Sequence, residues 1–499
     1  MNTRLVGLFV IILFTIPAAI LIGSWTATDP MMAAAALIGL VAMGALLALG
    51  KNIWMLIPAF YPFSEALVGA PLGFALRDII TIYVLVGLVM LWVVKRYKLG
   101  LQFSVKEGSL LAVYALLVFA FIRNPIGFAV FGSAKIGARP YIECFIALIV
   151  YGILSSQIVS MNKVRQSGLL WFLGGISSAV VQIVGSVSPS VGYYVSQVYQ
   201  IRGGGALGGA SASATADTGV GRLMYLKTLV RPLCAGLMAV TRPIGLLNPM
   251  KPYLFIGVSI LVASALLSGF RSMLLWIAMM YIASAIVRRK KLDIVIAVAS
   301  GLLVLSVLVA GNGSLFNLPI SVQRSLSFIP GDWDYVATED AEGSIEWRVE
   351  MWEIGMYTDE FIKNKIVGDG YGLTLDDMEY HGHIQTKPVV THEDMQEFFM
   401  RSGDWHSGPV ETIHRIGIVG LLVVTLSLII FAKYAFRIMR KCENTGYYAP
   451  ALFAGLPLLI YPFQYIFIYG TLLQAVTMMT MHGGMLRLIE NSMGMAAED

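Results

Sequence analysis

Charged residues are scarce in this 499-residue chain, at 13% of the total against 57% hydrophobic residues. An ordinary soluble domain has about 25% charged residues, and the mean hydropathy of +0.75 excludes that class. Cysteine is scarcer still. The three cysteines, Cys144, Cys234 and Cys442, lie in or beside apolar stretches or on the predicted inner side, so neither a disulfide framework nor a cysteine metal site is expected. The composition therefore predicts a polytopic membrane protein.

Long apolar runs, close to the ~20 residues that cross a bilayer, predict an all-α bundle of about 14 transmembrane helices, within a range of about 12 to 14. We place the spans near residues 5–24, 31–49, 52–69, 78–95, 108–123, 140–157, 168–187, 224–241, 252–269, 273–288, 293–311, 410–432, 447–466 and 470–487. The glycine-rich stretch within 188–221 is expected to be an outer loop. A phosphate cradle is disfavoured there because the Lys-Ser/Thr pair of a P-loop is missing.

Lysine and arginine in the short loops fall mostly on the side that holds the N-terminus, as in the run 288–291. Because such residues favour the cytoplasm, we expect both termini to be cytoplasmic and the first span to be retained rather than cleaved. The net charge of +5 reflects these loops and gives no support for binding of nucleic acid. The prediction is a bundle of about eleven helices in 1–310, an extracytoplasmic loop domain in 311–409, and further transmembrane helices with a short cytoplasmic tail in 410–499.

The segment 311–409 is a polar island in this apolar chain, and we expect the chemistry to lie in it. It holds much of the acid and His381, His383, His392 and His406. A helix is predicted over 344–362, with Ser344 as its N-cap. A metal site is disfavoured, because the His-x-His spacing alone is a weak signal.

Three residues are candidates for catalysis. Arg271 lies at the outer end of a span, where it either anchors in the lipid headgroups or faces a pocket between helices. Arg348 stands between two glutamates, so a surface ion pair is its simplest explanation. His406 lies where the island re-enters the membrane; it is either structural or a base that takes a proton from a sugar hydroxyl.

Other cations are candidates for binding an anionic substrate. Arg222, Lys227 and Arg231 recur at a spacing that places them near one face of a helix, where they form either an anion path or the polar face of an interfacial amphipathic helix. Arg139 and Arg324 are further candidates on the predicted outer side. The tryptophans of the island, including Trp352 and Trp405, either stack on sugars or pack the loop.

In their order and predicted topology, these motifs resemble the O-antigen ligase and polysaccharide polymerase superfamily of bacterial membrane glycosyltransferases. Leu267-Ser-Gly-Phe-Arg271-Ser resembles the Ser-Arg motif of that superfamily. Arg348-Val-Glu-Met-Trp352, followed by Gly368-Asp-Gly-Tyr-Gly, resembles its Arg-x-x-x-Trp and Gly-x-Gly signature, and His406-Ser-Gly-Pro, followed by Gly417-Ile-Val-Gly, resembles its His-Asn/Ser motif. The chain has Ser407 where many members have Asn.

The resemblance implies a GT-C-like bundle in the bacterial inner membrane, in contact with membrane lipids and working without a metal or other cofactor. It implies a polyprenyl-pyrophosphate-linked oligosaccharide as donor and a glycan acceptor, with a chain-length regulator and a flippase as possible partners. Arg271 and Arg348 would bind the pyrophosphate, while His406 would activate the acceptor hydroxyl for transfer with inversion.

Two alternatives to an exopolysaccharide or O-antigen polymerase remain open. A ligase would transfer the finished glycan to a lipid or protein acceptor by the same chemistry. A transporter or flippase of lipid-linked sugars would need paired ionisable groups within the membrane or matched broken helices. The spans hold few acids, chiefly Glu65 and Glu143, which disfavours this third reading.

Overall fold

The computed structural model describes residues 49–68, 74–93, 100, 103–125, 137–200, 221–248, 250–372, 374–387 and 391–495. Its regular structure is helical apart from a single antiparallel ladder between two-residue strands, β1 (Ala66–Leu67) and β2 (Tyr199–Gln200). Seven of the described helices are long and apolar enough to cross a membrane: α4 (Leu76–Val93), α5 (Val105–Arg123), α6 (Ala138–Ser155), α7 (Met161–Val187), α13 (Lys291–Gly311), α18 (Gly408–Lys441) and α19 (Tyr448–Phe467). The prediction of a polytopic α-helical membrane protein is confirmed, while the number of spans stays a prediction.

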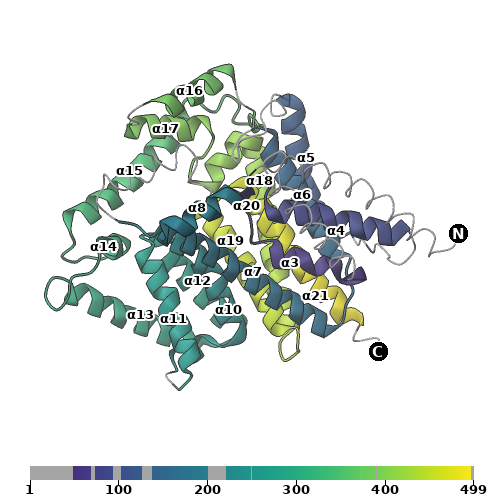
Figure 1. Cartoon of the computed structure of the whole chain (residues 1–499), viewed down its shortest axis with the longest axis horizontal. Coiled ribbons are helices and arrows are strands. Elements are labelled where there is room, and N and C mark those ends of the chain that lie inside the picture. The colour runs from purple at the N-terminus through teal and green to yellow at the C-terminus, as the bar shows by residue number, and fades with distance from the viewer. Residues whose placement is uncertain are drawn as a thin grey trace.

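The bundle is built around α18, which packs against α5 and α19 (Figure 1). On one side α19 contacts α7 and α10 (Lys227–Val240), and α10 in turn contacts α11 (Pro252–Leu267) and α12 (Arg271–Val287). On the other side α6 packs against the C-terminal helix, which consists of α20 (Leu472–Thr477), a π-helical turn, η6 (Met478–His482), and α21 (Gly483–Met495). One continuous apolar core joins these helices.

Two predicted spans differ from the structure. Residues 52–69 do not form one helix: η1 (Gly50–Met55) and α3 (Leu56–Phe60) end just before Pro62, and the chain then runs extended into β1. Pro62 has no backbone N–H to donate to the carbonyl one turn earlier, which explains the early end of the helix. The spans predicted at 5–24 and 31–49 lie outside the described residues, apart from Leu49.

The predicted span 224–241 is shorter than expected. A 3₁₀ turn, η4 (Met224–Leu226), precedes the 14 residues of α10, which contain Pro232. At 1.5 Å per residue, α10 is about 21 Å long and falls short of the roughly 30 Å hydrocarbon core. Its buried face, with Val230, Cys234 and Met238, packs among α7, α11, α12 and α19, so α10 belongs to the bundle and is not an interfacial helix.

Many cations of the predicted inner loops are paired with acids in the structure. Arg242, just before η5 (Pro243–Leu247), contacts Asp293 of α13 at 2.9 Å. Arg487 contacts Glu490 within α21, and Lys106 at the start of α5 lies 3.9 Å from the same carboxylate. These contacts join helix ends that the predicted topology places on one side of the membrane. The orientation of that side stays a prediction.

The described residues of the polar island form four helices, α14 (Ile320–Leu326), α15 (Tyr335–Tyr357), α16 (Leu375–Thr386) and α17 (His392–Arg401). Of these, α15, α16 and α17 lie together beyond the bundle (Figure 1). The predicted start of the second helix at Ser344 is wrong, because α15 begins nine residues earlier, at Tyr335, and ends at Tyr357. Asp334 caps it by accepting a hydrogen bond from the Val336 amide, so the stronger N-cap lies upstream.

The island is anchored to the bundle by a small apolar cluster. Met351 of α15, Met400 of α17 and Trp405 pack with Val410 and Ile413 at the start of α18. This packing crosses the domain boundary predicted between 409 and 410. The island and the start of α18 therefore form one continuous structure there, and the division into three domains stays a prediction.

Candidate active site between the bundle and the polar island

Arg271 is the first residue of α12, and its side chain reaches the island. Gly269 lies in the turn between α11 and α12 with φ +73°, a conformation that side chains with a Cβ rarely adopt. This turn directs the Arg271 Nη2 toward the Ala341 carbonyl of α15, to which it donates at 2.7 Å. Arg271 thus joins a bundle helix to the island. The positive end of the helix dipole repels a cation at the helix N-terminus. An anion bound there is attracted both by the dipole and by the Arg271 guanidinium.

Two further arginines meet on one carboxylate beside this turn. Arg222, upstream of η4, and Arg324 of α14 both bond the same oxygen of Asp340 on α15. Arg324 also donates to the Gly269 carbonyl, so it holds the turn that carries Arg271. The predicted substrate-binding residues Arg222 and Arg324 therefore lie near Arg271, and both form an ion pair with Asp340.

Arg348 completes a group of four guanidinium ions, which we call the arginine cluster: Arg222, Arg271, Arg324 and Arg348. Burial, followed by the positive charges of Arg324 and Arg271, lowers the pKa of the Arg348 guanidinium. Its Nε is buried without a hydrogen-bond partner among the described residues, and no ion pair to Arg348 is found there. The carboxylate of Glu350 instead accepts from Gln396. Arg348 is thus no surface ion pair, and the cluster carries excess positive charge suited to an anion.

His406 and Arg348 are linked through Tyr469, whose ring lies 6.0 Å from the imidazole and which interacts electrostatically with the Arg348 guanidinium. His406 is held in an unusual backbone conformation. Its φ is +52°, in the left-handed region that non-glycine residues seldom occupy. The Nδ1 atom lies 3.1 Å from Oδ1 of Asp404, whose side chain is 9% exposed. The ring of Trp347, next to Arg348 in the chain, lies 5.6 Å from the imidazole. A carboxylate on Nδ1 favours the tautomer with its proton there, which leaves Nε2 free to accept a proton.

The segment that carries His406 is fixed by the two tryptophans predicted as sugar contacts. Trp352 of α15 donates to the Trp405 carbonyl at 2.7 Å, and the Trp405 indole donates to Nδ1 of His414 at 2.9 Å. The Trp405 side chain is completely buried and offers no face for stacking on a sugar. These bonds therefore favour a positioning role for both tryptophans.

The glycine motif of the island lies against a break in α18. Gly417 has φ +74° and interrupts the helix, and the Asp369 and Gly370 amides donate to the carbonyls of His414 and Arg415 just before it. A Cβ at Gly368 would collide with the backbone at Ile416. The motif thus has a packing role, because two backbones approach too closely for larger residues.

The other predicted substrate residues lie at the edge of the site or within the bundle. Lys227 Nζ lies 4.9 Å from the centre of the Phe270 ring, next to Arg271 in the chain. Arg231, one turn along α10, is exposed, and its positive charge acts on Tyr469. Arg139 bonds Glu143 within α6 at 3.0 Å, and Glu143 also bonds Arg77, so this predicted site residue belongs to a buried ion-pair network of the bundle.

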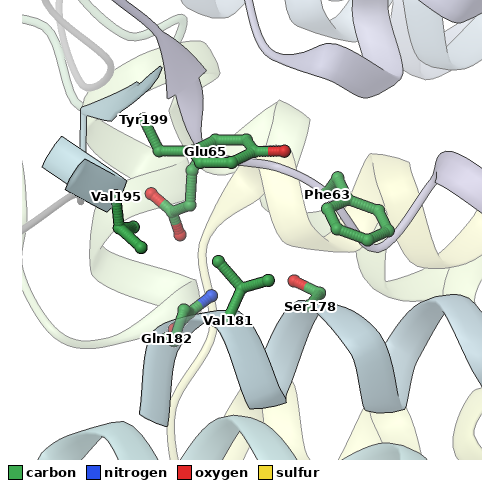
Figure 2. Close-up of a pocket in the computed structure, with 7 residues that line it drawn as sticks. All are labelled: Phe63, Glu65, Ser178, Val181, Gln182, Val195 and Tyr199. Atoms are coloured by element: carbon green, nitrogen blue, oxygen red, sulfur yellow. The ribbon is translucent and has the colours of Figure 1, made fainter. Parts of the chain in front are cut away.

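A small, mostly apolar pocket elsewhere in the bundle does not include the arginine cluster. It lies between the segment at 63–65, α7 and α8 (Pro189–Val198), near β2, and Figure 2 shows the Glu65 carboxylate pointing into it. Its other lining residues are Phe63, Ser178, Val181, Gln182, Val195 and Tyr199. The candidate active site is therefore identified by its converging charges and not by this hollow.

Sequence reasoning missed Asp340, Arg415 and Tyr469. Asp340 is one acid in an acidic stretch, so no sequence signal distinguished it. Arg415 is fully buried in α18, where it donates to the Gly370 and Ser402 carbonyls and lies 4.5 Å from the centre of the Tyr371 ring. A charged residue inside an apolar run is costly and commonly functional, so this one carried a usable signal.

The comparison with known families agrees with this geometry. Residues 256–425 match the O-antigen ligase family. The match confirms the resemblance predicted from the motifs, and it extends from α11 into α18, so it contains Arg271, Arg324, Arg348 and His406. Arg222, Lys227 and Arg231 lie outside the matched O-antigen ligase segment. No curated protein matches the chain.

The match supports an enzyme of the O-antigen ligase and polymerase type. It implies a lipid-linked oligosaccharide and a glycan acceptor as the substrates of a multi-pass membrane protein. The arrangement is chemically suited to such a transfer, because it places a cluster of cations beside an imidazole that is oriented by a carboxylate.

Proposed function

We propose that this protein is a polysaccharide polymerase of the exopolysaccharide or O-antigen type, acting on the outer face of the bacterial inner membrane. The donor would be a glycan on polyprenyl pyrophosphate, and the acceptor a sugar hydroxyl. The observation that supports the proposal is that the arginine cluster and the His406–Asp404 pair both interact with Tyr469, near the starts of α12 and α18.

In the proposed reaction, Nε2 of His406 takes the proton of the acceptor hydroxyl as its oxygen attacks the anomeric carbon of the donor sugar. The bond from that carbon to the phosphate oxygen breaks, and polyprenyl pyrophosphate leaves with the electron pair. Attack from the face opposite the leaving group inverts the anomeric carbon. Arg348 and Arg271 stabilise the charge that develops on the pyrophosphate, a role for which guanidinium forks are well suited.

The same cations support a reaction without a metal. Phosphoryl and pyrophosphate leaving groups need positive charge, which enzymes supply with divalent ions or with arginine and lysine. The arginine cluster supplies four guanidinium groups, and Asp340 bonds two of them. We infer that the arginines provide the charge in place of a metal, in a GT-C-like bundle whose two termini are cytoplasmic.

The roles are tested by Arg271→Ala, Arg348→Ala and His406→Ala, with Arg437→Ala as a matched control. The Arg437 side chain is 67% exposed and lies at the far end of α18. Consumption of lipid-linked glycan is measured in membranes that contain equal amounts of each protein. Loss of one charge-stabilising donor is expected to slow transfer by about 10²–10³-fold. Near-normal rates in all three site variants would end the assignment.

A ligase remains the alternative, because the matched family is described by that activity. A polymerase and a ligase differ in the acceptor that receives the glycan. Purified protein is supplied with a lipid-linked repeat unit as the sole glycan: a polymerase yields a ladder of longer lipid-linked glycans, whereas a ligase leaves the repeat unchanged until a separate lipid acceptor is added. The flippase reading has less support, because the matched family is described by ligase activity and not by transport.

A further inference from the structure

The His406 imidazole is surrounded by aromatic rings from three separate segments. The ring centroid of Phe399 on α17 lies 5.0 Å from it, that of Trp347 on α15 lies 5.6 Å away, and that of Tyr469 lies 6.0 Å away. Phe399 and Trp347 also pack edge-on against each other. Of the three rings, only that of Tyr469 carries a hydroxyl group. It comes from the turn between α19 and α20, far from the other two in sequence.

That turn is held firmly by backbone bonds. The amides of Ile468 and Tyr469 both donate to the Gln464 carbonyl at 3.0 Å. Gly470 follows, and a Cβ there would lie 2.7 Å from the Tyr465 ring. Thr471 then caps α20 through its side chain. The position of the Tyr469 ring beside His406 is therefore set by the fold of the turn.

Charged residues from both the proposed base and the arginine cluster act on the Tyr469 hydroxyl. Burial, followed by the negative charges of Asp404 and Glu411, raises the pKa of the Tyr469 hydroxyl, while the positive charges of Arg231 and Arg348 oppose this shift. The hydroxyl consequently stays protonated at neutral pH and is able to donate a hydrogen bond. Asp404 belongs to the base, and Arg348 belongs to the arginine cluster.

We propose that Tyr469 is a further catalytic residue, whose hydroxyl donates a hydrogen bond to the transferred sugar between the pyrophosphate at Arg348 and the acceptor at His406. This inference rests on the proposed glycosyl transfer. The transferred sugar must lie between its leaving group and its nucleophile. Tyr469 interacts with a residue proposed for each, because its ring lies 6.0 Å from the His406 imidazole and the charge of Arg348 acts on its hydroxyl. The aromatic ring would line the same space.

The competing explanation is that Tyr469 only packs against His406. Tyr469→Phe separates the two, because it keeps the ring and removes only the hydroxyl. Tyr465→Phe is the matched control: Tyr465 lies one helical turn earlier on α19, is fully buried, and bonds the Thr412 hydroxyl. Both proteins are purified in detergent and compared by thermal melting before activity is measured.

Initial rates are then measured with the lipid-linked repeat unit extracted from the native host. We expect Tyr469→Phe to lower kcat about tenfold with little change in KM and in melting temperature, as for loss of one hydrogen bond made in the transition state. Tyr465→Phe should retain kcat. A Tyr469→Phe protein with kcat within about twofold of the parent, or an equal loss in Tyr465→Phe, overturns the inference. If Arg348→Ala and His406→Ala are also fully active, the proposed function has failed instead.

Discussion

The pairing of Asp404 with His406 makes a sharp prediction about the variant Asp404→Asn. The Oδ1 to Nδ1 distance is 3.1 Å, and the Asp404 side chain is only 9% exposed, so the bond is well shielded from water. An asparagine fits the same space, but its amide can donate to Nδ1. That bond favours the tautomer with the proton on Nε2, and the imidazole then has no lone pair for the acceptor hydroxyl. The base would be lost while the fold is kept.

The expected size of the effect follows from what the carboxylate does. General-base catalysis contributes about 10²–10⁴-fold, and in a serine protease triad the same change costs about 10⁴-fold in kcat. We expect kcat of Asp404→Asn to fall by about 10²–10⁴-fold. KM for the lipid-linked donor should change little, because the arginine cluster is untouched.

The assay is the initial rate of transfer by purified protein at saturating donor, compared with His406→Gln and with the double variant. Residues that act as one unit are strongly non-additive, so the double variant should be no slower than His406→Gln alone. A wild-type rate in Asp404→Asn, or effects that simply multiply in the double variant, would refute the view that Asp404 works through His406.

Three further predictions follow from the same structure. Arg348→Lys keeps the charge and loses the planar guanidinium fork, so the initial rate of transfer should fall by about tenfold or more, while the melting temperature stays unchanged. A transfer rate equal to that of the parent would show that the charge alone suffices. Gly368→Ala should lower the melting temperature, at an expected cost of about 1–3 kcal/mol, because the new Cβ meets the backbone at Ile416 and φ is +75°; Gly343→Ala, in an open part of α15, is the control and should be neutral or slightly stabilising. Excess EDTA should leave the initial rate of the purified protein unchanged, and recovery of a lost rate by added Mg²⁺ or Mn²⁺ would contradict the role given to the arginines.

The positions of most membrane helices could be predicted from the sequence, because bilayer crossing imposes a length and composition that each segment displays by itself. The helices α4 to α7, α13, α18 and α19 overlap predicted spans. The prediction failed where local backbone chemistry outweighed hydropathy. Pro62 ended α3, and Asp334 began α15 well before the expected cap at Ser344. An apolar run therefore predicts burial more reliably than it predicts an unbroken helix.

The candidate catalytic residues were found from the sequence, whereas their partners were not. Arg271, Arg348 and His406 belong to short motifs whose order along the chain can be recognised from the sequence alone. Asp340 and Tyr469 act through contacts with residues far away in sequence, such as Arg222 with Asp340 across 118 positions. Such pairing leaves no local periodicity or spacing, so only the folded chain shows it.

The sequence by itself determined that this chain lies in a membrane, where its polar island falls, and which family it resembles, because each of these depends on composition or on short motifs. Only the tertiary structure decided that four arginines from separate segments share one region, that Arg348 is free of the neighbouring glutamates within the described residues, and that Trp405 is buried rather than open to a sugar. The physical reason is that charge convergence and burial depend on the distances between segments, which are set when the island packs against the starts of α12 and α18.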